Sequence, residues 1–176
     1  MATAMKDKKQ RKAAARRSLQ FHSLDDLIAD LDAIEAGHHA GTLVTTGNWT
    51  PGENLHHCAK TWTMSLDGWP ADAKPPAWLK FIVKTFFKKS AVSGKPAPIG
   101  IPFPKGLEDA FGPKVGATFE EGMGAMRKGT QRIKAGERFT HPSPLFGPLT
   151  HEEWLKLHLG HCAMHMSFLH PDGVRG

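Results

Sequence analysis

Proline is distributed unevenly along this chain of 176 residues, and its distribution limits where long helices can form. Eight of the 13 prolines lie in residues 68–117, at positions 70, 75, 76, 96, 98, 102, 104 and 113. Proline inside a helix removes a backbone hydrogen bond and clashes with the preceding turn, so this stretch cannot form one continuous helix. We therefore expect a long crossover rich in Pro and Gly, with helices before and after it.

The first helix is predicted over residues 23–36. Ser23 suits the N-cap position, Asp26 three residues later completes a capping box, and Gly37 suits the position after the last turn. The apolar residues recur at helical spacing, which indicates that one face is buried. These residues are Leu24, Leu27, Ile28, Leu31 and Ile34.

Three further long helices are predicted from similar signals. Thr50 caps the second helix, Glu53 completes its capping box, and Asp67-Gly68 ends it. The third is predicted over 118–136 and the fourth over 151–169, where Thr150 and Glu153 form another capping box. No segment alternates as a strand would. The expected fold class is all-α, with four long helices and the long crossover between the second and the third.

One short helix is predicted inside the crossover, over "PAWLKFIVKTFFKK" at 76–89. Its composition is aromatic and basic, which is compatible with binding at a membrane surface. We favour packing on the domain or at a subunit interface, and we expect a homodimer formed through the aromatic run from Trp78 to Phe87.

The net charge of +6 is a property of the N-terminus. Residues 1–17 hold seven basic residues and one acidic residue, and the charges of the remaining chain balance. We expect a disordered basic arm over 1–17 and a globular domain over 18–176. The alternative, in which the basic arm binds nucleic acid or another acidic surface, is not favoured. No run approaches the roughly 18 apolar residues of a membrane span. No membrane association is expected, and the predicted location is the cytoplasm.

The stretch "HLGHCAMH" places His158, His161 and His165 on the apolar face of the fourth helix. A buried imidazole needs hydrogen-bond partners or a metal. His161 and His165 have the i, i+4 spacing that helical zinc proteases use for two ligands. The intervening residues lack the glutamate that serves as base in those proteases, so a protease is not expected.

A third ligand would have to come from another helix, and His56 and His57 on the second helix are the candidates. The apolar stripe of that helix is centred near Leu55. His56 lies about 100° from this stripe and His57 about 200° from it, at 3.6 residues per turn. Periodicity slightly favours His56 and leaves both open.

The segments "NWTPGENLHHCA", "FGPLTHEEW" and "HLGHCAMH" together resemble the DinB/YfiT-like superfamily of four-helix-bundle metalloenzymes, and in particular a bacterial subfamily of unknown function. The resemblance extends from Arg17 to Leu169. It implies a DinB-like four-helix bundle, and a ligand eight residues after a tryptophan, which here is His57 after Trp49. The implied metal ligands are therefore His57, His161 and His165, with His56 or His158 as a supporting residue or a replacement ligand.

Three neutral imidazoles leave a divalent metal at least one open coordination position, which is typical of a catalytic site. Imidazole suits zinc, nickel and iron, so the ligands do not identify the metal. Zinc in such a site lowers the pKa of bound water to roughly 7, which suits a hydrolase. The resemblance implies a thiol-dependent transferase, with a low-molecular-weight thiol or another small molecule as partner. The alternative is a non-catalytic stress protein that binds a metal or a ligand. Cys58 and Cys162 are interpreted as small core residues and not as ligands.

Overall fold

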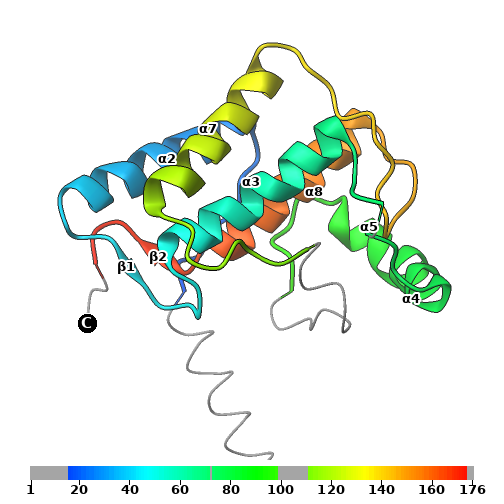
Figure 1. Ribbon diagram of the computed structural model, residues 1–176, viewed down its shortest axis with the longest axis horizontal. Coiled ribbons are helices and arrows are strands. Elements are labelled where there is room, and N and C mark those ends of the chain that lie inside the picture. The colour runs from blue at the N-terminus through cyan, green and yellow to red at the C-terminus, as the bar shows by residue number, and fades with distance from the viewer. Residues whose placement is uncertain (1–15, 72, 99–110, 174–176) are drawn as a thin grey trace, which may run out of the picture.

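The computed structural model describes residues 16–71, 73–98 and 111–173, and this part of the chain is mostly helical (Figure 1). Its long helices are α2 (Leu24–His39), α3 (Pro51–Asp67), α7 (Phe119–Lys134) and α8 (His151–Met166). Each begins with a capping box in which the N-cap hydroxyl accepts from a backbone N–H and an acidic side chain accepts in return. The predicted positions of these helices are confirmed.

The long helices share one hydrophobic core. Helix α3 packs against both α7 and α8, and α2 packs against α7 (Figure 1). The largest fully buried side chains of this core include Trp62 on α3 and Trp154 on α8. Because α3 is covered on two sides, residues on two of its faces are removed from water.

A two-stranded antiparallel sheet joins the segment after α2 to the segment after α8. Strand β1 (Val44–Thr45) pairs with β2 (Leu169–His170), with Val44 opposite His170. The sequence analysis predicted no strand and extended the last helix to residue 169, whereas α8 ends at Met166. Strands of two residues are too short to produce an alternating pattern, and their partners are far apart in the sequence.

Gly37 does not end the first helix, which continues to His39. A Cβ atom at Gly37 would lie 2.5 Å from the carbonyl oxygen of Pro171, so the glycine allows the C-terminal segment to approach α2 closely. Gly41, with a φ of +70°, follows the C-cap residue of α2. The prediction that Gly37 ends the helix is wrong, because this glycine is needed for close packing and not for termination.

The helix predicted in the crossover is present as three consecutive pieces: α4 (Ala77–Ile82), a π-helical turn η1 (Val83–Phe87) and α5 (Lys88–Ala91). None of their residues is buried. Farther along, the backbone at Lys95 approaches α8 so closely that only a glycine fits at Gly160. Residues 99–110 of the predicted crossover lie outside the described residues.

The predicted N-terminal arm is described only at its last two residues, since residues 1–15 lie outside the described part. Both of these residues instead contact the domain. Arg17 forms an ion pair with Asp30 at 2.6 Å and donates from its backbone to Ser167, and the guanidinium of Arg16 lies over the ring of Phe168. Within the described ranges, no helix is both long enough and apolar enough to cross a membrane.

Candidate metal centre

Helices α3 and α8 bring His57, His161 and His165 together. One ring nitrogen from each side chain lies within 4.8 Å of the others. The Nε2 atoms of His57 and His161 are 3.1 Å apart, and the ring centroids of His57 and His165 are separated by 4.5 Å. The three side chains predicted from the family resemblance therefore converge on one point between two helices.

The choice between His56 and His57 depends on which faces of α3 are covered. His57 is 1 % exposed and points toward α8, whereas His56 is only partly buried and lies beside α7, where its backbone nitrogen is close to Gly122. The slight preference of the periodicity for His56 is wrong. That argument assumed a single buried stripe, and α3 has two.

Two residues, one just before α3 and one on it, contact the histidines of the cluster. The indole of Trp49 stacks on His165 at 5.1 Å with an interplanar angle of 5°, and its centroid is 5.0 Å from that of His57. The side-chain amide of Asn54 donates to the backbone oxygen of His165 at 3.1 Å. Support of this kind around metal-binding histidines orients their rings.

Burial determines the protonation of the three histidines. It lowers the pKa of His161 to about 4, and it lowers those of His57 and His165 well below the ordinary value. The neighbouring imidazoles lower the pKa values of His57 and His165 further, while backbone groups of Phe111 and Gly112 act on His57 in the opposite direction. All three rings are therefore neutral at pH 7, and neutral imidazole is the form that binds metals.

The donor set fits a divalent cation. Three neutral ring nitrogens face one another in a partly enclosed site. This group of possible ligands contains no carboxylate and no thiol. Two Nε2 atoms at 3.1 Å can share at most one proton, so at least one of them presents a lone pair to the space between the rings. A cation at that point would accept these lone pairs.

His158 is separate from this cluster, although it lies only one turn before His161. It is fully buried between Trp62, Trp154 and Phe139, and its Nε2 lies 3.1 Å from the hydroxyl of Ser65. We expected His158 as a supporting residue or a replacement ligand, but its ring packs in the core beside Trp154. The group of ring nitrogens within 4.8 Å of one another does not include His158.

The cysteines that follow His57 and His161 contact each other in the core. Cys58 and Cys162 are both fully buried, and burial together with the neighbouring thiol raises the pKa of Cys58. A raised pKa keeps this thiol protonated, whereas metal binding requires the thiolate. The interpretation as small core residues agrees with this geometry.

In the sequence, Trp49 served only to locate the ligand eight residues later, and no role was predicted for Asn54. The stacking of Trp49 on two of the histidines could not be anticipated, because the residue precedes the N-cap of α3 and its direction depends on the loop before the helix. Asn54 carried one usable signal: it lies one turn before Cys58 on the apolar side of the helix, where an amide needs a partner.

A family model described as "Protein of unknown function (DUF1569)" matches residues 13–172. The chain belongs to the DUF1569 family. The match includes α2, α3, α7 and α8, so in this DUF1569 protein all three clustered histidines lie inside the family domain. Neither the curated proteins nor the solved structures contain a match to the chain.

Proposed function

We propose that this DUF1569 protein binds a divalent metal ion through His57, His161 and His165 and is a metal-dependent enzyme. The observation that supports the proposal is the convergence of three neutral imidazoles, with ligand atoms within 4.8 Å of one another. Three neutral ligands leave the full charge of the cation uncompensated and at least one coordination position open, as in catalytic zinc sites.

The reaction class follows from the chemistry that such a cation supplies when bound, which is a pKa of about 7 for a coordinated water and a deprotonated state for a coordinated thiol. We therefore propose a hydrolase or a thiol-dependent transferase acting with a low-molecular-weight thiol. Zinc, nickel and iron all fit imidazole ligands. The DinB-like four-helix bundle belongs to the same proposal, supported by the helix order and by the motifs around the histidines.

The protein's own residues would hold this site rigid. Stacking of Trp49 limits rotation of His165, and the amide of Asn54 fixes the backbone at the same residue. Ligands that cannot turn away keep the number of open positions constant, which is a condition for repeated turnover.

A non-catalytic protein that binds a metal or a ligand is the second candidate. It is favoured by one observation: the histidine cluster has no carboxylate member that could serve as general base. Histidine, glutamate and aspartate are the usual proton-transfer groups beside a reacting water, and here the histidines are already used as ligands.

Metal analysis of the purified protein tests the first step. We expect about one metal ion per chain in the wild type, and a loss of metal affinity of at least about tenfold in His161→Ala. His56→Ala is the matched control, because it removes a neighbouring imidazole outside the cluster and should keep the metal. Equal metal content in His161→Ala and the wild type would refute the site.

Turnover of the metal-loaded protein separates the two candidates. A panel of low-molecular-weight thiols with electrophiles, together with simple esters, should yield a product that the His161→Ala variant does not form. Metal binding without turnover on this panel would favour the non-catalytic candidate.

A further inference from the structure

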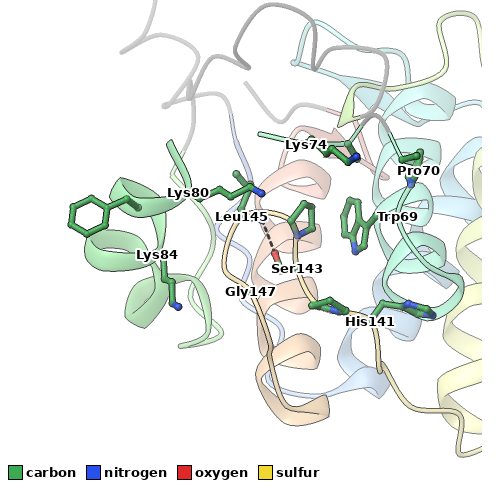
Figure 2. A pocket seen from close by; sticks show the side chains of 14 residues that line it. Trp69, Pro70, Lys74, Lys80, Lys84, His141, Ser143, Leu145 and Gly147 are labelled. Atoms are coloured by element: carbon green, nitrogen blue, oxygen red, sulfur yellow. Dashed lines mark hydrogen bonds between the residues drawn. The ribbon is translucent and has the colours of Figure 1, made fainter. Parts of the chain in front are cut away.

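A pocket of about 590 Å³ lies beyond the end of α3 and before the start of α8 (Figure 2). The histidine cluster lies at the opposite end of these helices, since His57 is near the start of α3 and His165 near the end of α8. The walls of the pocket come from Trp69 just after α3, from the loop between His141 and Gly147 before α8, and from Lys80 and Lys84 of the crossover helix. The ten residues from His57 to Asp67 span about 15 Å at 1.5 Å per residue, so the pocket is a separate site.

Three lysines give this pocket its charge. Lys74, Lys80 and Lys84 all line it, and none of the lining residues that the structure describes is acidic. None of the three ammonium groups forms an ion pair or hydrogen bond with another described residue, whereas Lys88, on the same crossover helix, is paired with Glu153. Three unpaired cations around one pocket repel each other and attract an anion.

The orientation of the crossover helix supports the same conclusion. Lys80 and Lys84 line the pocket together with Phe81, and Figure 2 shows the Lys80 side chain extending toward Leu145 of the loop. Meanwhile Trp78 is 62 % exposed and Phe86 is 70 % exposed. Burial of apolar surface alone would favour the reverse orientation, with the aromatic rings against the domain. A ligand that attracts the lysines would favour the observed one.

The remaining walls suit a ligand with an apolar body and a polar end. Trp69 contributes an indole wall, and its ring centroid lies 5.6 Å from that of Phe111 and 6.3 Å from that of Trp154. Ser143 is buried, and its hydroxyl oxygen accepts from the backbone N–H groups of Leu145 and Phe146. The hydroxyl proton is therefore left to donate to an acceptor in the pocket.

We propose that this pocket binds an organic anion, with a flat apolar body against Trp69 and a carboxylate or phosphate group near Lys80 and Lys84. Charge-assisted hydrogen bonds from lysine to these groups are among the stronger polar contacts. The proposal does not depend on the metal centre, because it uses none of its residues.

Calorimetric titration of the full chain with three probes tests the proposal: 1-naphthyl phosphate, 1-naphthoate and the neutral 1-naphthol. We expect at least one anion to bind at least about tenfold more tightly than 1-naphthol, because the neutral molecule cannot use the lysines. The comparison of the two anions identifies the preferred charged group, and tighter binding of either one supports the proposal.

A matched pair of double variants locates the binding. Lys80→Gln/Lys84→Gln should weaken binding of the better anion at least about tenfold. Lys89→Gln/Lys128→Gln removes the same charge from exposed positions outside the pocket and should leave the affinity unchanged. Metal content should be the same in both double variants, and circular dichroism checks that both are folded.

Two results would overturn the proposal. Equal weakening in the two double variants would mean that the anion responds only to the overall charge. Binding of vesicles that contain an anionic phospholipid, with no binding of either naphthyl anion up to 1 mM, would assign the lysines to a membrane surface instead.

Discussion

His158 shows how one hydrogen bond accommodates a buried imidazole without a metal. The hydroxyl of Ser65 donates its only proton to the backbone oxygen of Thr61 at 2.9 Å, so it must accept from Nε2 of His158. This arrangement fixes the tautomer with the proton on Nε2. Burial lowers the pKa of His158 well below the ordinary value, so the ring stays neutral.

We predict that Ser65→Ala lowers the free energy of unfolding by about 1–3 kcal/mol, because it leaves a buried N–H of His158 without an acceptor. Urea denaturation measures the change, and metal content should remain that of the wild type. Loss of the metal in Ser65→Ala would contradict the separation of His158 from the metal centre.

The lowered pKa values of the three clustered histidines predict how metal affinity depends on pH. Ligands with an ordinary pKa near 6.5 would compete with protons below that pH, and three of them would weaken metal binding about a thousandfold between pH 7.5 and pH 5.5. Here the pKa of His161 is about 4 and burial lowers those of His57 and His165 well below the ordinary value, so protons compete less with a metal at pH 5.5.

We therefore expect the metal affinity to change by less than about tenfold between pH 7.5 and pH 5.5, and to fall steeply only as the pH approaches 4. Competition with a chelator of known pH dependence measures it. A fall near a thousandfold over this range would show that the histidines are more accessible to water than their burial indicates.

At the scale of helices, α3 and α7 approach each other through glycine. A Cβ atom on Gly122 would lie 2.5 Å from the backbone oxygen of Gly52 and 2.9 Å from the Cβ of Leu55. Gly124, two residues later on the same helix, is exposed and has no neighbouring atom within 4 Å of the same position. The two glycines have equal helix propensity and opposite environments.

We predict that Gly122→Ala destabilises the protein by about 1–3 kcal/mol through overpacking of this contact. Gly124→Ala is the control and should stabilise it by about 0.5–1 kcal/mol, because alanine is the better helix former. Thermal or urea unfolding of both variants gives the comparison. Stabilisation by both substitutions would mean that α3 and α7 are farther apart than described.

At the scale of the whole molecule, the exposed aromatic side of the crossover helix is available to a second copy of the chain. Trp78 and Phe86 are among the most exposed large apolar side chains of the described residues, and neither lines the lysine pocket. The expected homodimer would cover this outer side and leave the lysine pocket on the inner side. Exposed apolar patches of this kind are typical of protein interfaces.

We predict a dimer in light scattering at micromolar concentration, and a monomer for Trp78→Ser/Phe86→Ser. Both positions are exposed, so the double variant should keep its helical content in circular dichroism. A wild-type protein that is monomeric at these concentrations would contradict the homodimer.

Local signals in the sequence were sufficient for the long helices and for two of the three candidate metal ligands. A capping box involves residues three apart, and its hydrogen bonds form within one turn, so the starts at Ser23, Thr50 and Thr150 could be predicted without knowledge of the fold. The same holds for His161 and His165, because residues four apart on a helix always lie on one side.

The tertiary structure decided everything that depends on segments distant in sequence. It selected His57 over His56 by covering α3 on two faces, it formed the β1–β2 sheet, and it turned His158 into the core. It also placed Lys80 and Lys84 in the lining of a pocket that includes the loop before α8. The physical reason is that burial and long-range pairing are properties of the packed assembly of helices, whereas a periodic pattern indicates only which residues share a face.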